Sequence, residues 1–257
     1  MKKTLLESTA DKLVDAFISG KIIAPIPTKF TKKLGEAQKL RKLCESKVKD
    51  PIIGFKAAGT GFPVMKKLKE KEPFYAAIFK KNFLKSGQKV KINKSTFGIE
   101  LEVCYLIKQS FFSSKGSITI KNVTKYISHM APCIEVIGYR QRKKGITSFG
   151  DLCSDFGANF KFLIGQKKKY KKINIGNLKT IISNKKIKQS VSGNTNTVYI
   201  NPLNSLRFVL NKLKKDKINL NKDFYVFTGS TVGVVPILGK GVYVGKIEKL
   251  GIVKAII

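Results

Sequence analysis

Two glutamates interrupt an apolar stretch of the sequence. Glu100 and Glu102 lie in the run STFGIELEVCYLI (residues 95–107), in a chain with 51 basic and only 16 acidic residues. Because side chains alternate across a β-strand, both glutamates project from one face, about 6.5 Å apart along the backbone, and the aliphatic residues between them point to the other face. Two carboxylates on a half-buried face repel each other and resist desolvation. A cation shared between them would resolve both problems.

A third acid, Glu135, lies in a similar apolar run, APCIEVIGYR. Three carboxylates favour a hard divalent ion, Mg²⁺ or Mn²⁺. If each glutamate gives one oxygen, an octahedral ion keeps three positions for water or substrate, as catalytic metal sites do. The alternative is that one or more of these glutamates pair with lysines on an edge strand. The spacing alone leaves both readings open.

Other kinds of reactive site find little support. The four cysteines include no C-x-x-C pair and the chain has one histidine, His129, so a zinc site is not expected, and the cysteines are expected in the core. We expect His129 to be structural rather than a catalytic base. The run GSTVG (229–233) lacks the spacing of a nucleophile elbow, and GVVPILGK (233–240) lacks that of a phosphate-binding loop.

The formal net charge of +35 suggests an anionic partner, but its composition argues against sequence-specific nucleic-acid binding. Only four of the 51 basic residues are arginines, whose planar fork reads bases and phosphates, and the lysines are spread from end to end. Non-specific binding to polyanions at low salt is expected. No apolar run approaches eighteen residues, and acids interrupt the N-terminal stretch, so neither a membrane span nor a signal peptide is expected. These features predict a cytoplasmic protein.

The pattern of the chain predicts an α+β fold. An amphipathic helix is expected in residues 1–20 with Gly20 at its end, a second in residues 32–47, and a third after the capping Asn201. A buried strand is predicted at Ile52–Ala57. Residues 121–130 are predicted as a helix, and residues 134–139, after Pro132, as a strand. We find no linker, so a single domain of residues 1–257 is expected, with a helical part (1–48) and a β-rich core (49–257).

The order of IGFKAAGT, FGIELEV, APCIEVIGYR, DFGANF, NPLNSLRFVLNKL and FTGSTVGVVPILGKG resembles the 2-keto-4-pentenoate hydratase family of the fumarylacetoacetate hydrolase superfamily. The resemblance runs over nearly the full length, and the E-x-E pair with its distant glutamate is the most specific part. It implies a β-rich mixed-sheet core of the fumarylacetoacetate hydrolase C-terminal-domain type, preceded by N-terminal helices. It also implies homo-oligomers and a role in the catabolism of aromatic compounds.

The resemblance further implies Mg²⁺- or Mn²⁺-dependent chemistry on small 2-oxo acids. Glu100, Glu102 and Glu135 match the metal ligands, Lys56 the lysine beside the substrate, and Thr228 a residue that helps to hold the substrate carboxylate. The metal would stabilise charge that develops on the substrate oxygen. Lys56 would supply positive charge, or would shuttle a proton if burial lowers its pKa.

Two departures from the family pattern bear on the reaction. Phe74 stands where family hydratases usually carry an acid, and Ala158 stands where they carry a serine. The first hypothesis is a hydratase, a lyase that adds water to a 2-hydroxydienoate such as 2-keto-4-pentenoate. The second is a decarboxylase of an unsaturated 2-oxo diacid on the same scaffold. A catalytically altered family member or a basic binding protein is the alternative from another class.

Overall fold

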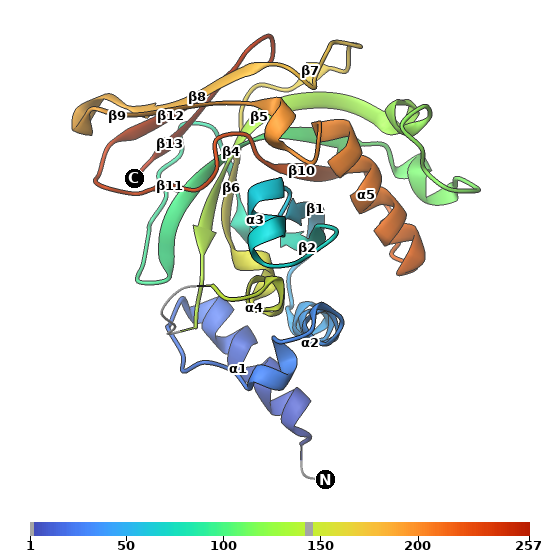
Figure 1. Ribbon diagram of the computed structural model, residues 1–257, viewed down its shortest axis with the longest axis vertical. Coiled ribbons are helices and arrows are strands. Elements are labelled where there is room, and N and C mark those ends of the chain that lie inside the picture. Colours follow the sequence, from blue (N-terminus) through green and yellow to red (C-terminus); the bar gives the residue numbers. More distant parts are fainter. Residues whose placement is uncertain (1–2, 142–145) are drawn as a thin grey trace.

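The computed structural model describes residues 3–141 and 146–257 (Figure 1). Its helices are α1 (Leu5–Ser19), α2 (Leu34–Lys47), α3 (Phe62–Lys67), α4 (Phe149–Ser154) and α5 (Pro202–Lys215). Its strands are β1 (Ile52–Ala58), β2 (Phe74–Phe79), β3 (Phe83–Lys85), β4 (Thr96–Ile107), β5 (Ile127–Gly138), β6 (Asn159–Ile164), β7 (Lys168–Lys169), β8 (Lys179–Asn184), β9 (Gln189–Asn194), β10 (Phe224–Ser230), β11 (Val235–Pro236), β12 (Val242–Ile247) and β13 (Gly251–Ile256). The α+β fold predicted from the sequence is confirmed.

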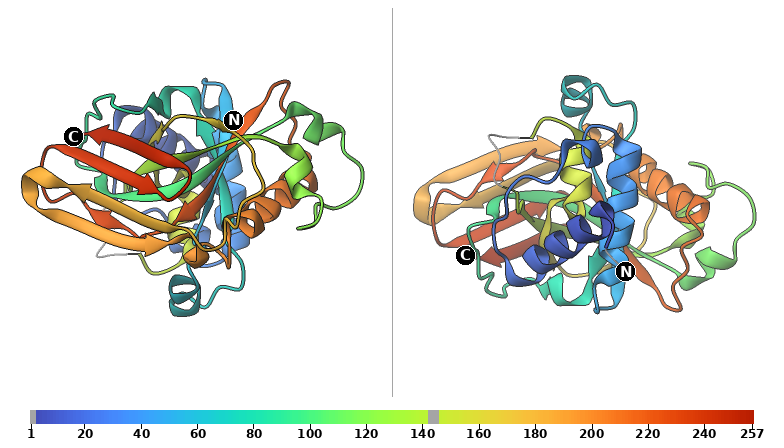
Figure 2. Two further views of the ribbon diagram at one scale, coloured as in Figure 1. Left: turned by 90° about the horizontal axis from the view of Figure 1, so that it is seen from above. Right: turned by 90° about the horizontal axis from the view of Figure 1, so that it is seen from below.

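Within the described residues the strands form two sheets. The larger has nine strands in the order β2-β1-β10-β4-β5-β6-β3, with β11 beside β4 and β7 beside β5. Strands β1 and β10 are parallel, as are β3 and β6, and the other pairs of this sheet are antiparallel. The second sheet has the order β13-β12-β8-β9 and lies at the end of the molecule opposite α1 and α2 (Figures 1 and 2).

The long pair β4–β5 separates the core from the predicted site. Alternate residues of these strands, including Leu101 and Ile134, are buried beneath the small sheet. The backbone of Gly245 comes so close there that a Cβ would lie 2.5 Å from Leu101 Cδ1. Residues of the other parity, including Glu100 and Glu135, therefore face the opposite side of the larger sheet. The alternation of apolar and acidic residues thus assigns one face to packing and the other to chemistry.

The N-terminal helices form where the sequence predicts them. Thr4 caps α1 through a reciprocal capping box with Glu7, and Gly20 ends the helix in the left-handed conformation (φ 71°). Figure 2 shows α1 and α2 side by side on the face seen from below, and Leu13 and Leu40 of these helices lie fully buried in the main core. The third predicted helix is α5, whose cap Asn201 accepts hydrogen bonds from the amides of Leu203 and Asn204.

The predicted helix over residues 121–130 is wrong. Only a short 3₁₀ turn forms at Val123–Tyr126, and β5 then runs unbroken through Pro132. The Pro132 carbonyl accepts a hydrogen bond from the amide of Gly165, just beyond the end of β6. Because Pro132 has no N–H group, it cannot return a hydrogen bond to the Gly165 carbonyl, and this missing bond coincides with the end of β6.

Within residues 3–141 and 146–257, no helix combines the length and the apolar character needed to cross a membrane.

Candidate metal centre

Strands β4 and β5 bring the three predicted glutamates together. Glu100 stands directly opposite Glu135 in the antiparallel ladder, and Glu102 stands opposite Cys133. One carboxylate oxygen from each glutamate lies within 4.8 Å of the other two. The spacing E-x-E supplies two of these groups from a single strand, and strand register supplies the third from a residue distant in the sequence.

Two oxygens of this cluster lack a partner among the described residues. Glu102 Oε2 accepts a hydrogen bond from the Gly229 amide (2.8 Å), but its buried Oε1 has no donor within reach there. Glu135 Oε1 accepts from the Lys56 ammonium, and its buried Oε2 is likewise unpartnered. Buried carboxylate oxygens without partners are costly. Two such oxygens, in a cluster where one carboxylate oxygen from each of three side chains converges, fit a divalent cation.

The charges lead to the same conclusion. Burial raises the pKa of Glu100 to about 7, and repulsion from Glu135 adds to this effect. Burial and the neighbouring carboxylates raise the pKa of Glu102, and burial raises that of Glu135. Three carboxylates face a single ammonium, so the fully ionised cluster has two uncompensated negative charges. A divalent cation would neutralise them.

Lys56 lies on β1 with 3% of its surface exposed. Its ammonium forms an ion pair with Glu135 and donates to the Gly157 carbonyl at 3.1 Å. Burial by itself lowers the pKa of Lys56, but attraction to Glu135, Glu100 and Glu102 outweighs it and raises the pKa. A proton-shuttling role for Lys56 was predicted only if burial lowered its pKa. The pKa is raised instead, so Lys56 carries a positive charge.

The loop that faces Lys56 has an unusual backbone. Phe156, Gly157 and Ala158 all have left-handed φ angles, of 52°, 66° and 60°. For residues with a Cβ this conformation costs about 1–2 kcal/mol each. The turn directs the Gly157 carbonyl to Lys56, and it places the Ala158 side chain at the edge of the site. Strain held in this way is common where geometry serves function.

A cavity of about 410 Å³ opens over the acid cluster. Its lining includes Lys56, Glu100 and a largely apolar wall, formed by Val64, Leu68, Phe97, Ile137, Leu152 and Val234. One more cation, Lys67 of α3, lines the same cavity. This volume lies within the range of small-molecule sites.

The structure does not bring the predicted Thr228 to the cavity. Its side chain is fully buried, and its hydroxyl donates to the Val103 carbonyl at 2.9 Å. The hydroxyl-bearing residues that line the cavity are Thr60 and Ser230. Sequence analysis missed Thr60, although its position in the Gly-Thr-Gly turn directly after the Lys56 strand was an available signal.

The two departures from the family pattern occupy different places. Phe74 is buried and packs edge-to-face on Phe149, with ring centroids 5.6 Å apart, and it does not line the cavity. Ala158 does line the cavity and presents a methyl group. His129 lies on β5 in register with Lys169 and is likewise not part of the cavity wall.

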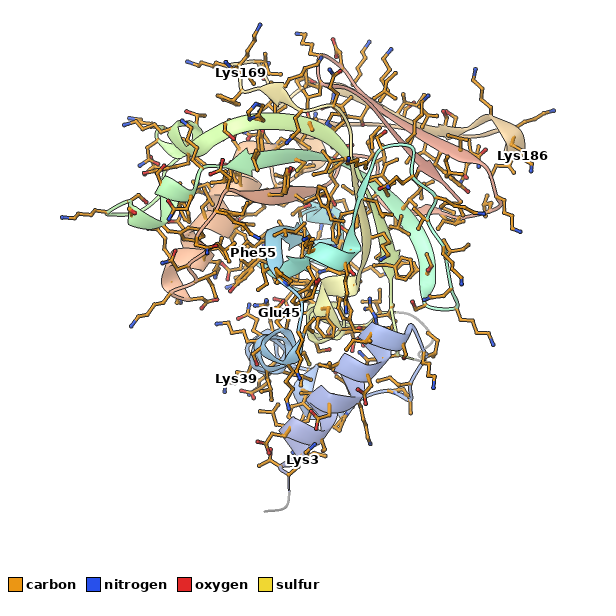
Figure 3. The ribbon with its side chains drawn as sticks, turned by 180° about the vertical axis from the view of Figure 1, so that it is seen from behind. Lys3, Lys39, Glu45, Phe55, Lys169 and Lys186 are labelled. Atoms are coloured by element: carbon orange, nitrogen blue, oxygen red, sulfur yellow. The ribbon has the colours of Figure 1, made fainter. Side chains whose placement is uncertain are left out.

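The acid cluster is enclosed in a strongly cationic protein. Side chains with nitrogen ends project outward around the whole molecule, as Lys3, Lys39, Lys169 and Lys186 illustrate in Figure 3. These four labelled lysines come from different parts of the chain, in agreement with the even spread of lysine in the sequence.

No protein-family model matches the sequence, and no curated protein matches it. Solved structures do match the fold. The 4-oxalocrotonate decarboxylase from Pseudomonas putida G7, complexed with magnesium and adipate, has a TM-score of 0.86 at 17% identity, over 99% of this chain and 98% of that one. The fold is of the fumarylacetoacetate hydrolase type.

Two further structures show the same superfamily fold at lower similarity. The fumarylpyruvate hydrolase from Pseudomonas aeruginosa, in complex with Mn²⁺ and pyruvate, has a TM-score of 0.60 at 10% identity and covers 82% of this chain and 91% of that one. The fumarylacetoacetate hydrolase from Exiguobacterium antarcticum has a TM-score of 0.55 at 12% identity and covers 81% and 75%. The fold predicted from the sequence is thereby confirmed, and the specific hydratase family stays a prediction.

Proposed function

We propose that this protein is a divalent-metal-dependent enzyme that acts on a small 2-oxo acid. One observation carries the proposal: three glutamates, two of them with unpartnered buried oxygens, converge beside the buried Lys56, and Glu100 of this cluster lines a largely apolar cavity. The protein structures of the same fold that were obtained with magnesium, calcium or manganese support the proposal.

Glu100, Glu102 and Glu135 would hold the ion, Mg²⁺ or Mn²⁺. A divalent cation bound there supplies Lewis-acid stabilisation of negative charge on the oxygens of a 2-oxo acid. Lys56 holds Glu135 in place and keeps a positive charge beside the reacting group, where anionic charge would develop. The apolar walls limit the access of water and strengthen these electrostatic interactions.

Decarboxylation of an unsaturated 2-oxo diacid is the reaction that the cavity favours. Loss of CO₂ moves the electron pair of the broken C–C bond through the conjugated chain to the 2-oxo oxygen, and it needs no activated water. The apolar wall, which includes the methyl group of Ala158, suits such a step because it limits the access of water to the developing anion. The whole-length similarity to a decarboxylase bound to adipate, a dicarboxylate, supports this choice.

Hydration, the first hypothesis from the sequence, is the second candidate. It requires groups that position water over the far carbon of the dienol. Thr60 and Ser230 line the cavity and carry hydroxyls, so two such groups are present.

Proton NMR with two substrates distinguishes these reactions. The protein is incubated with 2-oxohex-3-enedioate or with 2-hydroxypenta-2,4-dienoate, in Mg²⁺ and in EDTA. Metal-dependent conversion of the diacid to 2-hydroxypenta-2,4-dienoate and CO₂ is expected, and it should be absent in Glu100→Gln. Glu36→Gln is the matched control, because Glu36 pairs with Lys39 on the exposed face of α2. Conversion of the dienoate to 4-hydroxy-2-oxopentanoate alone would instead establish hydration, and no turnover of either compound would contradict the proposal.

A further inference from the structure

Helix α3 places one lysine toward the cavity and its sequence neighbour away from it. Val64, Lys67 and Leu68 line the cavity, and their spacing of i, i+3 and i+4 puts them on one helical face. Met65 is buried in a separate apolar cluster with Phe74 and Phe149. Lys66 and Lys67 are both exposed to solvent, but only Lys67 lines the cavity.

The two cations of the cavity differ in their partners. Lys56 is occupied by Glu135 and the Gly157 carbonyl. Lys67 forms no ion pair or hydrogen bond to any of the described residues, whereas other lysines near the same segment do, such as Lys212 with Glu72. An ammonium that lines a cavity without a protein carboxylate is available to an anionic group of the ligand.

Much of the cavity wall is apolar. Phe97, Leu152 and Val234 supply much of it, together with the two aliphatic residues of α3. A ligand that suits this arrangement has a 2-oxo acid group at the glutamate end, a hydrocarbon chain along the wall and a second negative group at Lys67. A dicarboxylate of about six carbons has this pattern.

We propose that Lys67 is a specificity-determining residue that binds the second carboxylate of a 2-oxo diacid and so selects diacids over monoacids. This inference rests on the proposed function. Lys67 would act on substrate binding and not on bond cleavage, because a cation beside a carboxylate stabilises that group before any CO₂ leaves. Loss of Lys67 should therefore raise KM for a diacid without lowering kcat.

Binding of unreactive analogues tests this without any need for turnover. Calorimetry of the Mn²⁺-loaded protein compares 2-oxoadipate with 2-oxohexanoate, in which a methyl group replaces the second carboxylate. At low ionic strength the unmodified protein should prefer 2-oxoadipate by about three- to tenfold. Lys67→Gln should abolish the preference, whereas Lys67→Arg should retain it. Lys66→Gln, the same change one residue away on the other side of the helix, should leave the preference intact.

The outcomes separate this inference from the proposed function. If both analogues bind the unmodified protein and the preference survives in Lys67→Gln, or if no preference exists, the role of Lys67 is contradicted and the proposed function stands. If Mn²⁺ binds but neither analogue does, the proposed function itself fails. A far-ultraviolet circular dichroism spectrum checks that each variant is folded.

Discussion

Glu100 and Glu135 are direct cross-strand partners in the β4–β5 ladder, with their carboxylates on the same face. Like charges in that position destabilise a sheet. The arrangement persists in a chain that has only 16 acids, with Lys56 as the single nearby counter-ion. This placement is explained if the carboxylates repel one another without a metal and a bound divalent cation neutralises their charge.

Glu102→Gln should stabilise the metal-free protein and weaken its metal binding. The change removes one buried charge and its repulsion, while an amide oxygen can still accept the hydrogen bond from Gly229. We expect a gain of roughly 1–3 kcal/mol in the free energy of unfolding in EDTA. Mn²⁺ affinity should fall at least about 100-fold. Urea denaturation in EDTA measures the first effect, and a variant less stable than the unmodified protein would contradict the explanation.

Lys56→Met should destabilise the metal-free protein strongly. It leaves the buried carboxylate of Glu135 without its counter-ion, which costs about 3–5 kcal/mol. The matched control is Lys39→Met, which breaks a pair whose side chains are 69% and 43% exposed and should cost less than about 1 kcal/mol. Urea denaturation of both variants in EDTA provides the comparison. Equal losses of stability in the two variants would show that the buried ion pair of Lys56 contributes no more than the exposed ion pair of Lys39.

The stability of the metal-free protein should fall as pH rises from 4.5 to about 7. The folded-state pKa of Glu100 is raised to about 7 from 4.5, so the folded protein holds a proton that the unfolded chain has released. The contribution of Glu100 is therefore fully present below pH 4.5 and lost as pH passes 7, by roughly 2–3 kcal/mol. The raised pKa of Lys56 does not change the stability over this pH range, because its contribution is fully present at every pH below 10.5.

Denaturation in EDTA across this pH range, compared between the unmodified protein and Glu100→Gln, isolates that contribution. The difference in unfolding free energy between the two proteins should change by the stated amount. A difference that does not vary with pH would contradict it.

Salt should slow the capture of anionic substrates. A net charge of +35 attracts anions over distances that added salt screens. We expect kcat/KM for a 2-oxo diacid to fall several-fold between about 20 and 200 mM salt. Steady-state rates of the metal-loaded enzyme measure this, and a salt-independent kcat/KM would exclude steering.

Local pattern was sufficient for part of the fold and of the site. The same-face placement of Glu100 and Glu102 follows from strand alternation, and the limits of α1 follow from its cap and from Gly20. The partnership with Glu135 could not be derived from spacing, because register between distant strands depends on the whole sheet. The apolar run around Glu135 suggested it as a third ligand, and the family resemblance matched it to one.

The errors have physical causes of the same kind. Val123, Ile127 and Met130 have helical spacing, but pairing with β4 and β7 makes a strand of residues 127–130. Pro132 was interpreted as a boundary because a proline cannot donate to a neighbouring strand, but β5 continues through it between β4 and the end of β6. Helix α3 and its Lys67 were missed, although Pro63 in the first turn after Gly61 is a recognised helix-start signal.

The most direct measurement is a titration of the protein with Mn²⁺, followed by electron paramagnetic resonance of the free ion, for the unmodified chain and for Glu100→Gln, Glu102→Gln, Glu135→Gln and the control Glu36→Gln. We expect one Mn²⁺ site in the unmodified protein and in the control. In each of the other three variants the affinity for Mn²⁺ should be at least about 100-fold weaker. Addition of oxalate, which mimics the anionic form of a 2-oxo acid, should perturb the spectrum of the bound ion. Binding that is the same in all five proteins, or no binding at all, would contradict the metal centre and the function proposed from it.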